Sequence, residues 1–424
     1  MHFNTFLLRF GLNPEDFVDK PIDPIPFEDG FIYELEQADG LRVCPNCGST
    51  NCYIKEHKNV IVRNNETIHK NEILKIRKIR YACNDCKKTF TKPLKGIQKY
   101  NEISDQTKRA ILAELFEPIS FSAVAKKYNI SLHKVIDIFD SNTRIVPRRQ
   151  MPEVLCIDEI HFDEEVFQKY VAVITDFNRR EIVDIIQSRQ MPFMREYFGN
   201  IPKKERENTK IFISDMYEGY DTICRQYFPK AIHIIDLFHV ITQLTNALNR
   251  IRVQVMNSCA TKGTPQYNFM KQKWQYFLCR KSRVPDKFYT VRKTGEILHY
   301  DDLLFSCIKL RSDLWEGYDC LQELFNYSKY FTYEESLRFI ERIITKLEGT
   351  GNQILISVAK TYHKWRYEIA NGFASKSRIN NYTNAIAEGL NNQLKTIIKN
   401  AYGYHNFQRF RKRAMLIMTY KKGI

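Results

Sequence analysis

The spacing of apolar positions divides the chain into regions with different expected structure. Residues 59–82, NVIVRNNETIHKNEILKIRKIRYA, alternate apolar and polar side chains with the two-residue period of β-strands. From Ser104 to Thr143 the apolar spacing becomes helical, in short runs separated by polar turns. Ser131 is placed to cap the last of these helices, because a serine hydroxyl accepts a hydrogen bond from the first helical turn. We therefore expect strands followed by three short helices.

After Met151 the pattern changes to short apolar runs that end in acids. EVLCIDEIHF, YVAVITDFN and EIVDIIQSR predict three strands, KIFISD a fourth and AIHIID a fifth, with helical stretches between the last three and after them. The order β-β-β-α-β-α-β-α is that of an RNase H-like core, an α/β layer architecture. Asp158 and Asp215 are expected at the carboxyl ends of the first and fourth strands, where ligands gather in such sheets.

The last amphipathic helix, YTNAIAEGLNNQLKTIIKN, carries amides and lysines on its polar face around one carboxylate, Glu388. Gly389 follows directly, although glycine inside a helix costs about 1 kcal/mol relative to alanine. Glu388 is either an incidental acid on a solvated face or a metal ligand where a polyanion must come close. Five segments are expected, which are an N-terminal segment with a zinc ribbon (1–100), a helix-turn-helix with its linker (101–150), the first part of the core (151–256), an all-helical insertion (257–370) and the final core helix with a basic tail (371–424).

Two Cys-x-x-Cys pairs flank the alternating segment. Each pair offers two thiolates from one tight turn, half of a tetrahedral zinc shell, so two pairs complete the shell for one structural Zn²⁺. A single pair would also suit a redox motif, but two together favour zinc. Cys52 and His57 are alternative ligands that fit the ribbon spacing less well. The expected ligands are Cys44, Cys47, Cys83 and Cys86.

The short helices with the turn YNIS have the spacing of a helix-turn-helix, whose last helix reads the major groove of DNA. His133 and Lys134 stand at the N-terminal end of that helix, where base contacts are made. The alternative is a plain three-helix packing unit. The basic stretch RIVPRRQ, residues 144–150, reads as a linker.

The composition favours a polyanionic partner. Among 424 residues, 65 Lys and Arg against 49 Asp and Glu give a formal net charge of +16, and nucleic acid is the commonest partner of so basic a chain. A basic surface without a specific partner is the alternative. No apolar run approaches the roughly 18–20 residues of a membrane span, and the N-terminus has no basic region with a cleavage site. We expect a cytoplasmic, nucleoid-associated protein that binds double-stranded DNA.

With these motifs the chain resembles bacterial insertion-sequence transposases of the DDE class, ISL-three type. The resemblance covers nearly the whole chain, and its most specific block is TNAIAEGLNNQLKTIIKNAYGYHNFQRFRKR. It implies that Asp158, Asp215 and Glu388 are catalytic acids that hold two Mg²⁺ or Mn²⁺ ions. Asp236 and His239 match the family's Asp-x-x-His, as buried supports or as direct participants.

The resemblance implies a transposase that binds the terminal repeats of its element, cuts DNA and joins the 3′ ends to a target, as a homo-oligomer on DNA. A DNA-binding regulator with an inert core and a nuclease without strand transfer are the alternatives. Four further acids are expected at the surface rather than as ligands, namely Glu159, Asp163, Glu164 and Glu218. The candidate phosphate contacts are Lys395, Lys399, Arg409, Arg411, Lys412 and Arg413.

Overall fold

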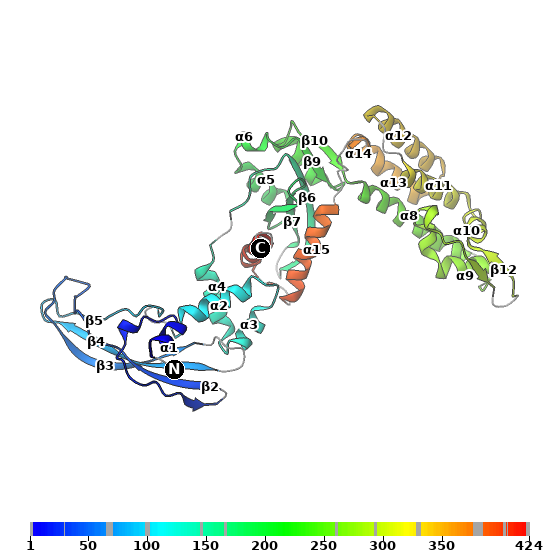
Figure 1. Ribbon diagram of the computed structural model, residues 1–424. Coiled ribbons are helices and arrows are strands. Elements are labelled where there is room, and N and C mark those ends of the chain that lie inside the picture. The colour runs from blue at the N-terminus through cyan, green and yellow to red at the C-terminus, as the bar shows by residue number, and fades with distance from the viewer. Residues whose placement is uncertain are drawn as a thin grey trace. The chain divides into compact units, whose positions relative to one another are not determined.

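The computed structural model of the chain describes residues 3–28, 30–64, 71–97, 102–144, 147–164, 168–258, 262–291, 295–327, 332–375, 385–401, 404 and 406–420 (Figure 1). These residues form two compact units. The first unit joins Met1–Val146 with Thr396–Ile424, and the second is Pro147–Lys395. Among the described residues, no helix is long and apolar enough to cross a membrane.

A five-stranded sheet forms the N-terminal part of the first unit, with strands in the order β1-β2-β4-β3 and β5 paired to β4. The expected strands of residues 59–82 are confirmed, because β3 and β4 pair antiparallel from Cys52↔Cys83 to Arg63↔Ile73. Their inward side chains pack with α1 in one apolar cluster. The bounds are α1 Phe3–Arg9, β1 Ile25–Phe27, β2 Gly30–Glu36, β3 Cys52–Arg63, β4 Glu72–Cys83 and β5 Thr89–Thr91.

The expected helices follow as α2 (Asp105–Leu115), α3 (Phe121–Lys127) and α4 (Leu132–Asn142). A serine caps each one, and Ser131 accepts a hydrogen bond from Lys134 N as the sequence indicates. The last helix, α16 (Phe407–Tyr420), packs its Leu416 against the apolar cluster of these helices. The C-terminal helix was expected with the core, so that assignment is wrong and α16 belongs to the first unit.

The second unit is built on a five-stranded sheet of order β10-β9-β6-β7-β8. Strands β10, β9 and β6 pair in parallel, and β7 and β8 pair antiparallel. The expected alternation of strands and helices is confirmed, with one extra short helix, α6. The bounds are β6 Val154–Glu164, β7 Gln168–Asp176, β8 Glu181–Ile186, α5 Met191–Gly199, α6 Lys203–Arg206, β9 Ile211–Ser214, α7 Glu218–Tyr227, β10 Ile232–Ile235 and α8 Leu237–Ser258.

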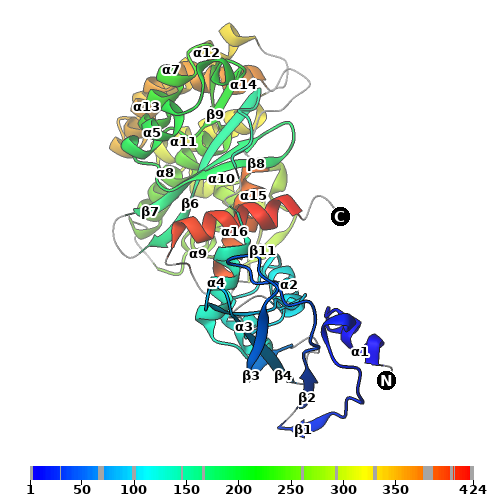
Figure 2. The ribbon, with the colours of Figure 1, turned by 90° about the vertical axis from the view of Figure 1, so that its left-hand side faces the viewer.

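The two faces of this sheet carry different helices. Leu155 and Ile157 of β6 pack in one cluster with residues of α5 and α7. Val154 and Cys156, which alternate with them, pack instead with Ala387 of α15 (Ala385–Asn400). Figure 2 shows the neighbouring strands β6, β7 and β8 of this sheet. The period-two alternation of β6 therefore directs Asp158 towards the face that α15 covers.

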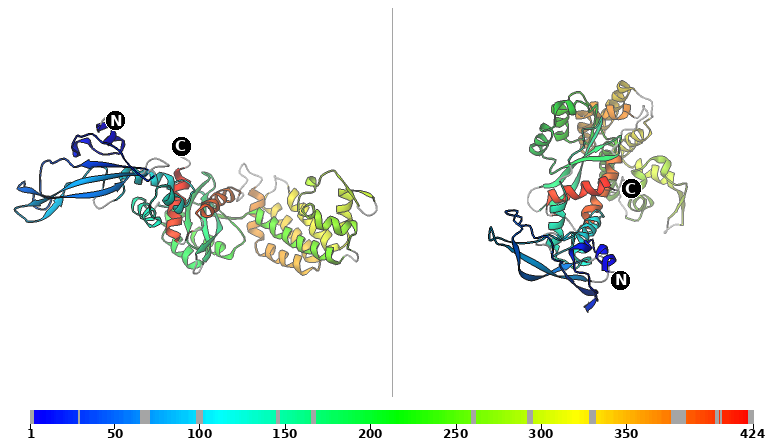
Figure 3. Two further views of the ribbon diagram at one scale, coloured as in Figure 1. Left: turned by 90° about the horizontal axis from the view of Figure 1, so that it is seen from below. Right: turned by 60° about the vertical axis from the view of Figure 1, so that its left-hand side comes forward.

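The long insertion packs along α8, whose inward side chains share one core with the insertion helices, as the green-to-gold bundle in Figure 3 shows. The prediction of an all-helical insertion is wrong, because β11 and β12 form an antiparallel hairpin inside it. The aromatic and aliphatic runs FYT and ILH pair around a turn that contains Gly295, at a φ of 71°. The bounds are α9 Pro265–Gln272, β11 Phe288–Thr290, β12 Ile297–His299, α10 Tyr300–Ile308, α11 Ser312–Asn326, α12 Tyr333–Gly349, α13 Gln353–Lys364 and α14 Arg366–Ser375.

Candidate active site

Aspartates stand at the same edge of neighbouring strands β10, β9 and β6. Asp215 directly follows β9, and Asp236 directly follows β10. Asp158 was expected at the end of its strand, and this is wrong, because antiparallel pairing with β7 continues β6 to Glu164. Its position along the sheet is still similar to that of Asp215, since the parallel pairing of β6 with β9 ends two residues earlier at Cys156↔Ile213.

Burial makes Asp158 and Asp215 difficult to ionise. It raises the pKa of Asp158, against the opposing effect of a hydrogen bond from Glu159 N. Burial also raises the pKa of Asp215 to about 6; the nearby His239 lowers it and the charges of Glu159 and Asp158 raise it further. Asp236 is only 2% exposed. Several carboxylates that share a poorly solvated edge favour the binding of a cation.

Helix α15 contributes an amide to this edge. Asn391 is 2% exposed, and its Nδ2 donates to Asp158 Oδ2 at 2.9 Å. Asn391 Oδ1 and Asp215 Oδ1 are both buried without a hydrogen-bond partner among the described residues. The sequence placed Asn391 on the polar face with Glu388 but gave it no role. Its spacing of three residues from Glu388, on the same helical face, was the available signal.

Glu388 lies on the first turn of α15 and is exposed. Within the described chain, the sets of three or more His, Cys, Asp or Glu whose ligand atoms lie within 4.8 Å of one another are the four cysteines and the set Asp221, His233 and Glu368. The structure thus brings the helix of Glu388 to Asp158 without bringing its carboxylate into a compact ligand set. Beside it, a Cβ built on Gly389 meets no described atom within 4 Å, so the surface there is open.

The Asp-x-x-His pair caps the start of α8 at the same edge. Asp236 N donates to Ser214 O at 3.0 Å, and Asp236 Oδ1 accepts from Phe238 N at 3.2 Å. His239 Nε2 lies 3.9 Å from Asp236 Oδ2, and the ring is about one-third exposed, with 34% of its side-chain surface open. His239 also favours the charged forms of Asp158 and Asp215. This geometry is compatible with both of the roles that the sequence leaves open.

Glu159 is not a freely solvated acid, which corrects the expectation. Arg189 Nη1 donates to both of its oxygens, at 2.6 and 2.7 Å, so Glu159 is not free to act as a ligand either. The guanidinium of Arg189 lies over the rings of Tyr170 and Tyr217, at 4.7 and 5.0 Å. Glu218 is exposed and pairs with Lys364, as expected of a surface acid. The side chains of Asp163 and Glu164 lie outside the described residues.

The four cysteines of the first unit form the expected cluster. Cys44 Sγ lies 3.6 Å from Cys86 Sγ, and Cys47 Sγ lies 3.6 Å from Cys83 Sγ. Sulfurs about 2.3 Å from a tetrahedral zinc ion are separated by about 3.8 Å, so the four thiols could hold zinc. A hydrogen bond from Cys86 N lowers the pKa of Cys83 to about 6, which favours the thiolate form. Cys52 packs beside the cluster without joining the ligand set, and His57 is exposed on β3.

The candidate DNA contacts divide into exposed and engaged side chains. His133, Lys395 and Lys399 are exposed, and Lys134 is half-buried. Arg413 is fully buried and donates to the backbone oxygens of the segment after α2, so its assignment as a phosphate contact is corrected.

Two more basic residues of α16 point to the end of α4 rather than into free solvent. Arg409 Nη2 donates to Asp140 Oδ2 at 2.7 Å. Lys412 Nζ donates to Thr143 O at 3.0 Å. Arg411 is half-buried. The basic tail therefore has a structural role that its sequence did not indicate.

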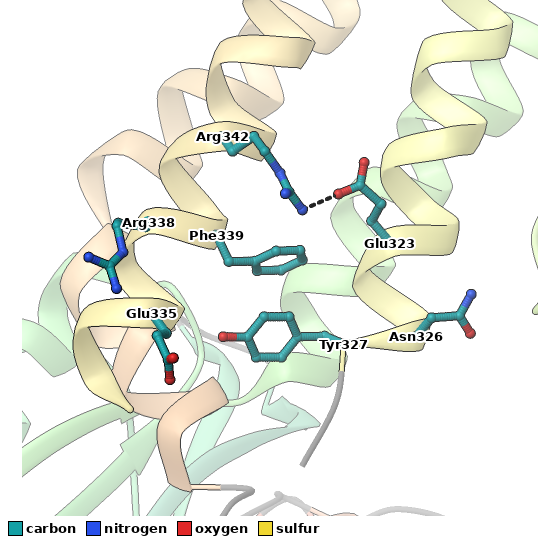
Figure 4. A pocket seen from close by; sticks show the side chains of 7 residues that line it. All are labelled: Glu323, Asn326, Tyr327, Glu335, Arg338, Phe339 and Arg342. Atoms are coloured by element: carbon teal, nitrogen blue, oxygen red, sulfur yellow. Dashed lines mark hydrogen bonds and ion pairs between the residues drawn. The ribbon is translucent and has the colours of Figure 1, made fainter. Parts of the chain in front are cut away.

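A hollow of about 560 Å³ lies in the insertion between α11 and α12 (Figure 4). The rings of Tyr327 and Phe339 lie 4.1 Å apart there, and Arg342 donates to Glu323 at 2.5 Å. The predicted acids do not line it, so it is separate from the candidate active site. Its lining residues are Glu323, Asn326, Tyr327, Glu335, Arg338, Phe339 and Arg342.

Comparison with known proteins decides the family. A family model described as "Transposase", of the ISL-three DDE type, matches residues 155–414. The chain belongs to the ISL-three family of insertion-sequence transposases. It is also 22% identical, over 374 residues that cover 87% of each chain, to the transposase for insertion sequence element IS1001 of Bordetella parapertussis. The part of this transposase that the family model matches begins after the two cysteine pairs and contains Asp158, Asp215 and Glu388.

Proposed function

We propose that this transposase binds the terminal repeats of its insertion sequence, cleaves DNA phosphodiesters at the edge of an RNase H-like sheet and joins the 3′ ends to target DNA. The observation that supports this most directly is that Asp158 and Asp215 lie at one edge of the sheet, where the buried Asp215 Oδ1 and Asn391 Oδ1 have no hydrogen-bond partner among the described residues. Orphaned oxygens beside buried carboxylates suit a hard divalent cation. The bases and backbone of DNA would then approach over the open surface beside Gly389.

The oxygen donors fit Mg²⁺ or Mn²⁺. Asp158 and Asp215 would hold the ions from the sheet, and Glu388 would contribute a third carboxylate from α15. When bound, two such ions supply an activated water or 3′-hydroxyl and stabilise the departing oxyanion. Asn391 orients Asp158 by donating to Oδ2. Asp236 and His239 support the edge, since Asp236 N donates to Ser214 O one residue before Asp215.

The first unit would supply DNA recognition. The exposed His133 and half-buried Lys134, on the first turn of α4, would read bases as in a helix-turn-helix. One zinc ion on the cysteine cluster would stabilise the end of the β3–β4 ribbon, because structural zinc contributes folding energy directly.

Lys395 and Lys399 are exposed one helical turn apart on α15 and would contact phosphates.

The deciding experiment is cleavage of element-end DNA in Mg²⁺ by the Asp215→Asn protein. Because the substitution keeps the shape but removes the charge that would hold the ion, cleavage should fall at least 100-fold while binding to element ends is retained. Glu218→Gln is the matched control, since that acid is exposed and should leave cleavage unchanged. A normal cleavage rate in Asp215→Asn would contradict the proposal.

Glu388 lies outside a compact ligand set, and this favours a second candidate function. The second candidate is a DNA-binding regulator with an inert core. In that case the wild-type protein would bind element ends and cut nothing in Mg²⁺ or Mn²⁺. A nuclease without strand transfer would instead cut DNA but fail to join pre-cleaved 3′ ends to a target plasmid. Both reactions can be followed on the same labelled ends.

A further inference from the structure

A second cluster of potential metal ligands lies on the opposite face of the sheet from α15. Asp221 of α7, His233 of β10 and Glu368 of α14 each present one ligand atom, and these atoms lie within 4.8 Å of one another. His233 packs edge-on against Phe212, whose cluster includes α5 and α7. The candidate catalytic face is the opposite one, where α15 packs. The cluster is therefore distinct from the site of Asp158 and Asp215.

The hydrogen bonds of Ser214 define which nitrogen of His233 carries a proton. Ser214 Oγ donates to Asp215 O at 2.9 Å, so its single hydrogen is already used. The contact of 2.9 Å between Ser214 Oγ and His233 Nε2 must then be donated by the imidazole. In the neutral ring, Nδ1 consequently carries a lone pair rather than a hydrogen.

That lone pair is directed at carboxylates. His233 is 9% exposed, and its Nδ1 is buried without a hydrogen-bond partner among the described residues. Asp221 Oδ1 lies 3.6 Å from His233 Nδ1, longer than a hydrogen bond. A lone pair facing negative oxygens is unfavourable, and either a proton on Nδ1 or a metal cation between the two groups relieves it. A ring whose other nitrogen donates to a neighbouring oxygen is also the usual arrangement of a metal-ligating histidine.

Two of the three elements that carry the ligands, α14 and β10, are held close together. Asn371 Nδ2 of α14 donates to His233 O at 2.9 Å. Gly372 lies so close to β10 that a Cβ there would be 2.7 Å from Ile235 O. Glu368, one turn earlier on α14, is only 14% exposed in its side chain. The packing of α14 on β10 thus fixes the positions of Glu368 and His233 relative to each other.

One cation already lies at the outer side of the cluster. Arg225 Nε donates to Asp221 Oδ1 at 2.9 Å, and Arg225 Nη2 lies 4.0 Å from Glu368 Oε1. Its side chain is 72% exposed, so it can move away at little cost. Arg225 neutralises one of the two carboxylate charges and leaves Nδ1 unsatisfied. A divalent ion would satisfy all three ligands and would compete with Arg225 for them.

We propose that Asp221, His233 and Glu368 bind one divalent transition-metal ion, with zinc as the expected occupant. A mixed set of one imidazole and two carboxylates suits Zn²⁺ or Mn²⁺, whereas Mg²⁺ and Ca²⁺ prefer oxygen ligands alone. The ion ties α14, where the insertion returns, to β10 and α7. Through Ser214 it also supports the backbone of Asp215. This site does not depend on the proposed cleavage reaction.

Zinc content and cobalt spectra of the full-length protein test the proposal. The wild type should hold two zinc ions per chain, one on the cysteines and one here, and Glu368→Gln should hold one. Glu218→Gln, on the same helix as Asp221 but exposed, should still hold two. After exchange into Co²⁺, thiolate charge-transfer absorption reports the cysteine site, while the visible bands of a nitrogen and oxygen site should be lost only in Glu368→Gln.

Arg225→Gln separates a metal site from a plain ion-pair network. If a metal competes with Arg225, removing the guanidinium should tighten zinc binding about tenfold in titration calorimetry and raise the melting temperature when Zn²⁺ is added. If the cluster is only a protonated His233 paired with Asp221 and Arg225, the substitution lowers the melting temperature and added Zn²⁺ has no effect. A wild-type protein whose zinc is fully accounted for by the cysteines, with no response to added Zn²⁺ or Mn²⁺, would overturn the proposal.

Discussion

At the scale of one residue, the burial of the Asp215 carboxylate lowers the stability of the folded protein. Burial raises its pKa from an ordinary 3.8 to about 6, so the folded protein holds the proton more tightly than the unfolded chain does. The ionised form of Asp215 therefore lowers the stability of the folded protein. Stability is highest when the group is protonated, below pH 3.8, and declines as the pH rises through about 6.

Asp215→Asn should therefore stabilise the protein at neutral pH when Mg²⁺ and Mn²⁺ are absent. A rise from 3.8 to about 6 corresponds to an upper value of about 3 kcal/mol at pH 7. The melting temperature of the variant should exceed that of the wild type at pH 7.5 by several degrees, and the difference should shrink as the pH falls from 6 to 4. Thermal unfolding followed by circular dichroism measures it, with Glu218→Gln as a control that shows no such trend.

The opposite result is also informative. If Asp215→Asn melts below the wild type at pH 7.5, the carboxylate is held by favourable contacts, and the site does not carry the excess negative charge that the geometry indicates. If the advantage of the variant disappears when Mn²⁺ is added, the ion has neutralised the charge in the wild type, as expected of a ligand.

At the scale of elements, α16 fastens the helices of the first unit. Arg413 Nε donates to Leu115 O, and its Nη2 donates to Glu117 O, both at 2.9 Å. Its guanidinium also lies 4.7 Å from the ring centre of Phe121. The guanidinium thus supplies donors to carbonyls at and beyond the end of α2, where the last turn of a helix has no intrahelical partners. One buried arginine thus completes the hydrogen bonding between two helices.

Arg413→Met should destabilise the first unit by about 3 kcal/mol or more, because it removes a buried guanidinium that donates to Leu115 O, Glu117 O and Ile119 O. Arg409→Gln, which removes a partly exposed pair with Asp140, should cost about 1 kcal/mol or less. Lys399→Gln should leave stability unchanged and weaken DNA binding. Denaturant unfolding and DNA binding at matched salt separate these outcomes. Equal stability of Arg413→Met and Arg409→Gln would mean that Arg413 is not the fastening residue.

The sequence predicted the local features of these elements well. The cap at Ser131 and the alternation of β3 and β4 depend on neighbours in the chain, so they could be predicted from the sequence. The role of Arg413 was not visible, because RFRKR has the composition of a solvated basic run and its partners lie nearly 300 residues away. Asp158 was placed too close to a strand end for a related reason, since the pairing with β7 that lengthens β6 is tertiary.

At the scale of the whole molecule, the chain order and the structural units do not coincide. The first unit is assembled from both ends of the chain, and α15 begins in the second unit and ends in the first. The sequence suggested a DNA-binding region complete by about residue 150. The structure instead completes that region with α16, through Arg413, Arg409 and Lys412.

A fragment that ends near Gln150 should therefore be a poor DNA-binding domain. It lacks the guanidinium of Arg413, which donates to Leu115 O and Glu117 O, and it exposes the apolar surface that Leu416 covers. A fusion of residues 1–146 to residues 396–424 through a flexible glycine-serine linker should melt at least 5 °C higher and bind element ends more tightly. The same fusion carrying Arg413→Met should behave like the short fragment, because the covalent link alone does not restore the hydrogen bonds. If the short fragment matches the intact fusion in melting temperature and in preference for element ends over random DNA, α16 is dispensable for recognition.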